Sequence, residues 1–501
     1  MKKLKLSKYV IVATLFVAML GCDSILENVE PSNAVSGEVV LTTENGVNAL
    51  RASMYAKVYQ SFSFTTDYFV GPSAFSDETR NRPGSSRYQA YNNAEGTFGT
   101  THMGNWGAGY DLIQDANLII GAVEDGVLPA ATLAQYRAEA LALRAFAYHN
   151  MVRVYGYEPG NFGQGPEANW NAGVIIRNEP VIDVSDADFR PRSTVGDVYT
   201  AILADLNEAE TLFTANGDGG SNTYVTLAFV HGMQARANLY AGNWQAAADA
   251  AQDAIDEFGG TLSNTQDAVT GMFNETSTGG NHPEALFKLV INPNTEGIAG
   301  GSGNNGPATY TSDGFMAQLP TQFVIDQYRA GDFRLGWYQP CADVQKNPLT
   351  QPTNCDAVNT AGLSSVKWSG DKLQSVDDLP MMRLAEMYLI RAEGLAKASN
   401  NAAAGSPALQ ALLDARNGGT VPAAALTSVD AFEDEILIER IRELAIEGHR
   451  FYDLKRLGRA ITNPDGSTKM RADSYRILAP LGSGLLNVNE LLVENPEYED
   501  N

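Results

Sequence analysis

The sequence predicts a mainly α-helical protein, an α-α superhelix of helical repeats that carries long irregular loops and a few short strands. The main observation is that apolar residues recur three and four positions apart, the period of an amphipathic helix. This pattern occupies 41–60, 106–124, 131–155, 194–214, 225–240, 244–257, 380–398, 407–415 and 430–457. Long segments rich in Gly, Asn, Ser, Thr and Pro lie between the helices, at 61–105, 156–193, 259–380 and 460–501. Loops of this length usually carry function, and a short apolar stretch at 285–291 suits a strand.

The stretch 228–255 indicates how the helices pack. It reads as two helices separated by the turn Gly242-Asn243-Trp244, and its alanines allow the two helices to approach closely. The pattern is tetratricopeptide-like, and such a unit needs a stacked neighbour to cover its apolar face. Similar Ala-rich helices with aromatic residues occur at 136–154 and 382–398, at irregular spacing. We therefore expect degenerate repeats interrupted by insertions.

The first 21 residues have the layout of a secretory signal peptide. Four lysines lie in the first eight residues, and the apolar run 9–20 is too short to cross a bilayer. The run ends in Met19-Leu20-Gly21-Cys22, which resembles the lipobox of bacterial lipoproteins, whose cysteine is acylated. We expect a signal peptide over 1–21, lipidation at Cys22 and a tether over 22–40. The alternative is an ordinary signal peptide that happens to be followed by a cysteine.

Composition excludes several classes of function. The net charge is −24, with 59 acidic against 35 basic residues, so the surface repels phosphate backbones and we expect no nucleic-acid partner. Hydrophobic residues make up 44% of the 501 residues, enough for a large core. Outside the leader no stretch is apolar enough to span a membrane, so we expect a protein that is anchored by lipid only.

The cysteines and histidines of the sequence do not form a recognisable metal-binding motif. Cys341 and Cys355 lie in a loop rich in Pro, Asn and Gln, where a disulfide is possible in an exported protein and two free thiols are the alternative. The five histidines are scattered along the chain without metal-ligand spacing. We expect no metal and no cofactor.

Five blocks of sequence, taken in order, resemble the SusD/RagB family of nutrient-binding outer-membrane lipoproteins. They are CDSIL at 22–26, YRAEA through VRVYG at 136–156, RSTV at 192–195 with the helix after it, RLAEMYL and RAE at 383–393, and EGHRF with DLKR at 447–456. Each block alone is weak, but their order behind a lipobox is specific. The resemblance covers essentially the whole chain after the leader.

The resemblance implies one SusD-like helical domain over 41–501, with an N-terminal part of about 41–260 and a C-terminal part of about 261–501. It implies a lipid-anchored protein at the cell surface of the outer membrane. Such a protein binds a nutrient, most often a glycan, and delivers it to a TonB-dependent SusC-like transporter without catalysis. One alternative is a helical-repeat adaptor that covers the transporter and has no nutrient site. Another is a glycoside hydrolase, although no carboxylate pair in an aromatic cleft stands out.

A ligand site is expected on the loops. A sugar presents an apolar C–H face and hydroxyls, so its site combines aromatic rings with amide, carboxylate or guanidinium groups. Loops 61–105 and 259–380 supply this mixture, and the resemblance points to the same two regions. The candidate residues are Asp77, Arg80, Tyr88, Tyr91, Asn92, Tyr310, Trp337 and Trp368. Packing within the loop explains any single aromatic among them equally well.

An acidic cluster near the C-terminus invites a catalytic interpretation. Glu439, Glu443 and Glu447 are spaced by four residues, which places them on one face of a helix. Such a face can pair with arginines of neighbouring helices through charge-assisted hydrogen bonds. Arg383, Arg391 and Arg144 are the candidates. We therefore predict a structural role for this cluster and no acid–base chemistry.

Overall fold

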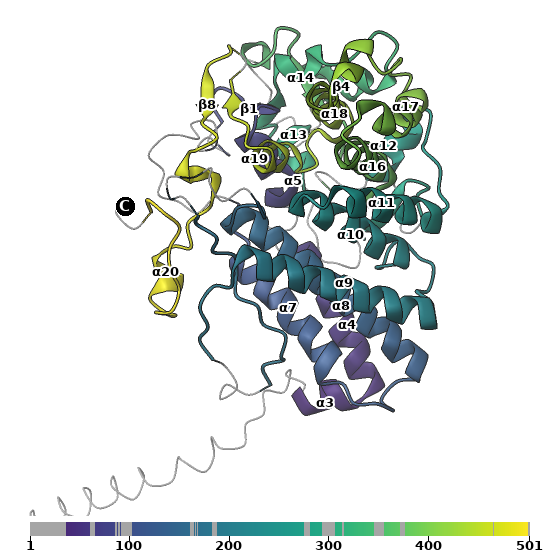
Figure 1. Ribbon diagram of the computed structural model, residues 1–501, viewed down its shortest axis with the longest axis vertical. Helices are drawn as coiled ribbons and strands as arrows, with labels where there is room; N and C mark the ends of the chain where they lie inside the picture. The colour runs from purple at the N-terminus through teal and green to yellow at the C-terminus, as the bar shows by residue number, and fades with distance from the viewer. Residues whose placement is uncertain are drawn as a thin grey trace, which may run out of the picture.

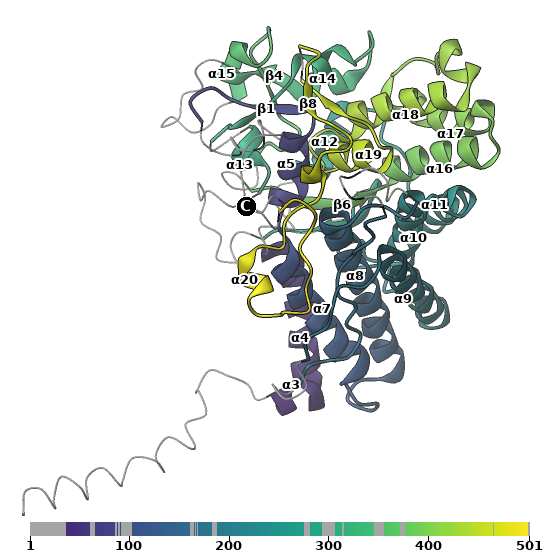
Figure 2. The same ribbon diagram turned by 60° about the vertical axis from the view of Figure 1, so that its left-hand side comes forward.

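The structure is a computed structural model, and its helices form one elongated stack (Figures 1 and 2). It describes residues 37–60, 66–85, 88, 91, 103–160, 165, 167, 169–182, 188–274, 281–292, 306–312, 315–344, 355–370, 376–463 and 465–498. The predicted leader, the lipidation site Cys22, most of the tether and Asn92 lie outside these residues. The mainly helical fold class is confirmed.

The N-terminal helices form the lower part of Figure 1. They are α3 (Gly37–Thr42), α4 (Glu44–Gln60), α7 (Trp106–Gly121), α8 (Ala130–Tyr155) and α9 (Val195–Asn216). In α8 every residue from Ala138 to Tyr155 is buried, because α7 and α9 both pack against it. A helix covered on all sides has no polar stripe, which explains the even spread of apolar residues in this segment.

The predicted helix–turn–helix unit is confirmed as α10 (Leu227–Ala241) and α11 (Trp244–Phe258). Gly242 adopts a left-handed φ of 76° and donates its N–H to the carbonyl oxygens of Asn238 and Leu239, which ends α10. The buried face of α11 consists of alanines only. This face packs on α16 (Leu384–Ala398), where a Cβ on Gly394 would lie 2.6 Å from the carbonyl oxygen of Trp244. Small residues on both helices thus allow close stacking.

The C-terminal helices continue the stack upward. After α16 come α17 (Ala402–Arg416), α18 (Val429–Leu444) and α19 (Arg450–Arg456). The single helix predicted over 430–457 is wrong, because the chain turns between α18 and α19. Ile446 and Gly448 there adopt left-handed φ values of 61° and 81°, which a helix cannot contain. Residues 379–383, at the start of another predicted helix, form a strand instead.

The strands pair into four short antiparallel ladders within the described part of the chain. The pairs are β1 (Thr79–Asn81) with β3 (Gln318–Pro320), β2 (Ala285–Leu289) with β6 (Leu379–Arg383), β4 (Tyr338–Pro340) with β5 (Leu363–Ser365), and β7 (Ile461–Thr462) with β8 (Thr468–Met470). The strand predicted at 285–291 is confirmed by β2. Both β2 and β6 are buried along their whole length, so this ladder is part of the core.

The long segments predicted as irregular also contain short helices. They are α5 (Thr66–Phe75), α12 (Gln266–Asn274), α13 (Ala308–Thr311), α14 (Gln322–Asp326), α15 (Cys341–Val344) and α20 (Ser483–Leu486). The disulfide that the sequence left open is present, and it joins Cys341 to Cys355. Figure 2 shows α5, α13 and α15 with β1 and β4 on one side of the upper part, opposite α16, α17 and α18.

The end of the chain returns to the N-terminal helices. Asn495 donates to the carbonyl oxygens of Tyr155 and Ala479 at 3.1 and 2.6 Å, and the Lys455 ammonium donates to the carbonyl oxygen of Arg153 at 2.7 Å. One hydrophobic cluster includes side chains from Leu50 to Leu492. The N-terminal and C-terminal parts therefore share one core.

Candidate ligand-binding site

The acidic cluster is a buried ion-pair network. The Glu443 carboxylate accepts hydrogen bonds from Arg334 and Arg383 at 2.8 Å each and from Arg416 at 3.0 Å. Burial alone would raise the pKa of Glu443, but Arg416, Arg383 and Arg334 hold this pKa well below its usual range. A carboxylate that is permanently ionised and buried cannot shuttle protons. Its role is to hold α18 against its neighbours.

Of the three arginines predicted to neutralise this cluster, only Arg383 does so, and it also binds Glu447 at 2.6 Å. Arg144 pairs with Asp205 at 2.6 Å instead, and Arg391 makes no ion pair within the described residues. The sequence correctly predicts a structural cluster, but it does not identify the other partners.

Two aromatic residues predicted to contact ligand lie in the core. Trp337 and Trp368 are 1% and 0% exposed. The indole N–H of Trp337 donates to Thr270 Oγ1 at 2.9 Å, and the ring of Trp368 lies 4.9 Å from that of Phe69 and 4.8 Å from that of Phe273. Neither ring face is open to a sugar, so both residues are corrected from ligand contacts to core residues.

Asp77 and Arg80 also make internal contacts. The buried Asp77 carboxylate accepts two hydrogen bonds of 2.8 Å from Arg450, which ties the end of α5 to α19. Arg80 donates to Asn463 Oδ1 at 2.6 Å and to the carbonyl oxygens of Ser76 and Thr79. Burial lowers the pKa of the Arg80 guanidinium from its ordinary value. Both side chains are therefore used in contacts within the protein.

The remaining three described candidates come together, with Phe315, in one aromatic cluster. The ring of Tyr88 lies edge-on to Tyr91 at 5.2 Å and to Tyr310 at 5.1 Å between centroids. Phe315 extends the cluster, 6.0 Å from Tyr310. Tyr310 is 2% exposed, so it too is corrected from a ligand contact to a buried residue that supports the cluster, whereas Tyr88, Tyr91 and Phe315 are partly exposed. We call the surface formed by Tyr88, Tyr91, Phe315, Asn81 and Arg82 the loop face.

Hydrogen bonds fix the tyrosines of the loop face. The Tyr88 hydroxyl donates to Asp67 Oδ1 at 2.8 Å. Burial raises the pKa of Asp67 to about 7, although the Tyr88 hydroxyl acts in the opposite direction. The Tyr91 hydroxyl accepts the N–H of Met103 at 3.0 Å. Arg82 donates from Nε to the carbonyl oxygen of Met316 at 3.2 Å, next to Phe315 in the chain. The ring orientations are therefore set by contacts within the protein.

The backbone around the loop face is strained. Tyr88, Met103 and Met316 have φ values of 57°, 49° and 41°, and bulky residues in the left-handed region are outliers. Such strain persists only where surrounding contacts impose it, and it gathers at binding and catalytic sites. Asp67, Met103 and Phe315 were not predicted from the sequence. Their contacts to Tyr88, Tyr91 and Tyr310 join residues 5 to 21 positions apart within irregular loops, and no helical or strand period marks such pairs in the sequence.

The described part of the chain offers neither a metal site of acidic, histidine and cysteine side chains nor a membrane-spanning helix. No three His, Cys, Asp or Glu residues lie close enough together there to hold a metal ion. No helix there combines the length and apolar character needed to cross a bilayer.

Comparison with known proteins covers most of the chain. A family profile described as the SusD family matches residues 344–498, and one described as starch-binding associating with outer membrane matches residues 26–228. The chain is similar to SusD-like protein P38 of Formosa agariphila, with 25% identity over 96% of this chain and 95% of that protein.

Solved structures share the fold. A SusD superfamily protein from Bacteroides thetaiotaomicron matches with a TM-score of 0.73 and 21% identity, over 91% of this chain and 100% of that one. A SusD-like carbohydrate binding protein from Bacteroides vulgatus matches with a TM-score of 0.71 and 18% identity, over 90% and 97%. At these identities the structural likeness establishes the fold.

Proposed function

The chain belongs to the SusD/RagB family of non-catalytic glycan-binding proteins, and from this premise we propose that it captures a glycan on the loop face and delivers it to a SusC-like TonB-dependent transporter. The observation that supports this site most strongly is the loop face itself. Partly exposed aromatic rings lie there, and the same loop supplies the amide of Asn81 and the guanidinium of Arg82, which also hydrogen-bond to Gln318 and to the carbonyl oxygen of Met316. Rings and polar groups are the two kinds of group that a sugar requires.

The geometry favours binding without large rearrangement. Tyr88 is held by Asp67 and Tyr91 by Met103 through hydrogen bonds within the protein. Side chains that are already ordered lose little conformational entropy on association, so more of the contact energy appears as affinity. A site whose side chains need not rearrange can bind and release a glycan readily. Delivery to a transporter requires both steps.

We expect Tyr88→Ala to weaken glycan binding roughly tenfold, because an aromatic platform contributes about 0.5–1.5 kcal/mol beyond its buried area. The measurement is isothermal titration of the purified full-length protein with a panel of soluble glycans that includes starch and laminarin. Tyr475→Ala is the matched control, since Tyr475 is also a partly exposed ring in an aromatic pair, 4.9 Å from Tyr498. Unchanged affinity in Tyr88→Ala, or no binding of any glycan by the wild type, would contradict the proposal.

Anchoring and partnership complete the proposed function. The family profile that matches residues 26–228 describes association with the outer membrane. We propose cleavage after residue 21, acylation of Cys22, a tether over 22–40 and a single domain over 41–501. The lipid anchor would hold the domain at the cell surface beside its transporter.

A surface away from the loop face supports contact with the transporter. A groove of about 450 Å³ between α7 and the C-terminal segment is lined by Trp106, Phe189 and Val488 among others. Phe189 and Val488 are 63% and 64% exposed. Exposed apolar side chains that gather around a groove mark protein interaction sites. We propose that the transporter covers this groove.

One experiment in the native bacterium tests both claims. We expect the tagged wild-type chain to carry an acyl label in the outer-membrane fraction and to co-purify with a barrel transporter. Cys22→Ser should lose the label and the membrane association, whereas Val488→Asp should stay in the membrane and co-purify less transporter. An unlabelled wild-type protein in the medium would refute the anchor. Undiminished co-purification of Val488→Asp would refute the docking groove.

A further inference from the structure

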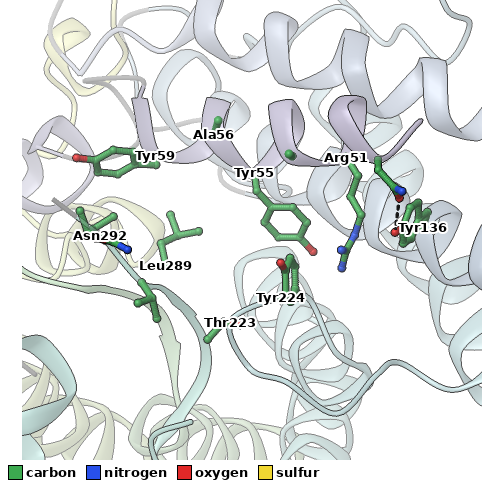
Figure 3. A pocket seen from close by; sticks show the side chains of 13 residues that line it. Arg51, Tyr55, Ala56, Tyr59, Tyr136, Thr223, Tyr224, Leu289 and Asn292 are labelled. Carbon is green, nitrogen blue, oxygen red and sulfur yellow. Dashed lines mark hydrogen bonds between the residues drawn. The ribbon is translucent and has the colours of Figure 1, made fainter. Parts of the chain in front are cut away.

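A second aromatic pocket lies on the N-terminal helices. It has a volume of about 690 Å³ and opens between α4, the first turns of α8 and the segment after β2 (Figure 3). Its lining includes Asn48, Arg51, Tyr59, Tyr136, Tyr224 and Asn292. The volume falls within the range of about 300–1,000 Å³ that is typical of small-molecule sites. The pocket shares no lining residue with the loop face.

Tyrosine rings surround a guanidinium at one end of the pocket. The Arg51 guanidinium carbon lies 4.0 Å from the ring centroid of Tyr224 and 4.5 Å from that of Tyr136. Tyr55 meets Tyr224 edge-on at 5.1 Å. Figure 3 shows Arg51 between the rings of Tyr224 and Tyr136, with Tyr59 and Asn292 at the other end. Around Arg51 the wall is therefore formed mainly by tyrosine rings, whereas aliphatic side chains such as Leu289 and Ile291 complete the rest of the pocket.

At the Arg51 end of the pocket, the positive charge of Arg51 is neutralised by Glu139. Arg51 donates from Nε and Nη2 to the two carboxylate oxygens of Glu139, at 2.6 and 2.8 Å. Glu139 is fully buried and also accepts the Tyr55 hydroxyl at 3.0 Å. The Tyr55 oxygen in turn accepts the N–H of Val225 at 3.0 Å. The Arg51–Glu139 pair carries no net charge and its hydrogen bonds are made within the protein, so this end of the pocket favours neither an anion nor a cation.

Polar groups at the rim remain available. Within the described residues, the Tyr224 hydroxyl, Arg51 Nη1 and the Asn48 side-chain NH₂ make no hydrogen bond, while Asn48 Oδ1 accepts the Tyr136 hydroxyl at 2.8 Å. Tyr224 is 40% exposed. Three available donors beside the exposed ring of Tyr224 match a ligand that presents hydroxyls on its edge and C–H bonds on its face.

We propose that this pocket is a second saccharide-binding site, for a neutral sugar unit, separate from the loop face. The class of ligand rests on the proposed glycan-binding function, whereas the location rests on the pocket alone. Two sites on one protein can hold one glycan chain at two points. Once the first site is occupied, the tethered chain has a high effective concentration at the second site. Long chains would be retained better than short ones.

Titration of the full-length protein with maltohexaose, laminarihexaose and xylohexaose tests the proposal. We expect two binding events for the preferred hexaose. Tyr224→Ala should weaken one event roughly tenfold and Tyr88→Ala the other. Tyr224→Phe, which keeps the ring and removes the hydroxyl, should lie between the wild type and Tyr224→Ala. Thermal unfolding of each variant verifies the fold.

The outcomes separate the two sites. A single event that Tyr88→Ala removes and Tyr224→Ala leaves unchanged would overturn the second site and retain the proposed function. A single event that only Tyr224→Ala removes would support the pocket and refute the loop face. No binding of any hexaose would overturn the saccharide assignment of the pocket, and the broader glycan panel would then decide whether the loop face retains its proposed function.

Discussion

Glu443→Gln is expected to lower the free energy of unfolding by roughly 3–5 kcal/mol, because breaking a buried ion pair leaves uncompensated charge in the core. The substitution keeps the size of the side chain and removes the negative charge that Arg334, Arg383 and Arg416 share. All four side chains are almost completely buried, so water cannot replace the lost interaction. Chemical denaturation monitored by circular dichroism measures the effect.

The control for this prediction is an exposed ion pair. Arg471 and Asp473 are 2.9 Å apart, and their side chains are 64% and 67% exposed. Asp473→Asn should change the free energy of unfolding by no more than about 0.5–1 kcal/mol, because solvent screens such pairs. Equal effects of Glu443→Gln and Asp473→Asn would show that burial does not strengthen the network.

The sign of the pH dependence follows from the lowered pKa of Glu443. A carboxylate with a lowered folded-state pKa contributes stability above its ordinary pKa of 4.5, and this contribution is lost as the pH falls toward the folded-state value. The difference in stability between the wild type and Glu443→Gln should therefore be constant near neutral pH and shrink below pH 4.5. A difference that grows on acidification would contradict this assignment.

Gly448→Ala is the second large effect, with an expected loss of roughly 3 kcal/mol or more in the free energy of unfolding. Gly448 has a φ of 81°, and a Cβ there would lie 2.1 Å from the carbonyl oxygen of Tyr68 in α5. That atom belongs to the backbone, so it cannot move without displacing α5. Because α5 carries Asp67, which holds Tyr88, glycan binding should weaken as well.

Gly84→Ala separates the cost of the left-handed backbone from the cost of the steric clash with α5. Gly84 has a similar φ of 86°, but a Cβ there would meet nothing within 4 Å. The expected cost is therefore only that of the left-handed backbone, about 1–2 kcal/mol. Calorimetric unfolding of both variants gives the comparison. If the two variants lose the same stability, the close approach to α5 has no energetic weight.

The stability of the C-terminal helices and the position of the loop face depend on connected contacts. The buried network holds α18 against the segments that carry Arg334, Arg383 and Arg416. The close approach of Gly448 and the Arg450–Asp77 ion pair hold the start of α19 against α5 and the residues just after it, and α5 carries Asp67, which holds Tyr88 of the loop face. A binding surface that is positioned by buried charge is stiff, because buried polar groups are costly to separate. A stiff support keeps the tyrosine rings of the loop face in the orientations that their internal hydrogen bonds set.

Local pattern alone determined a large part of this protein. The helical period identified α7, α8, α9, α10 and α11 within a few residues of their observed ends, because an amphipathic or small-residue pattern reflects the helix itself. The structural role of the acidic cluster also followed from its spacing of four residues. The family followed from five short blocks in order, and matching profiles confirm it.

Only the tertiary structure decided which residues are exposed. Trp337 and Trp368 are buried, while Tyr88 and Phe315 are partly exposed, and the composition of their loops does not distinguish them. The break between α18 and α19, the arginines around Glu443 and the pocket beside α4 all depend on segments distant in sequence. Burial, ion pairing and cavity shape arise from such long-range contacts, and a local period carries no information about them.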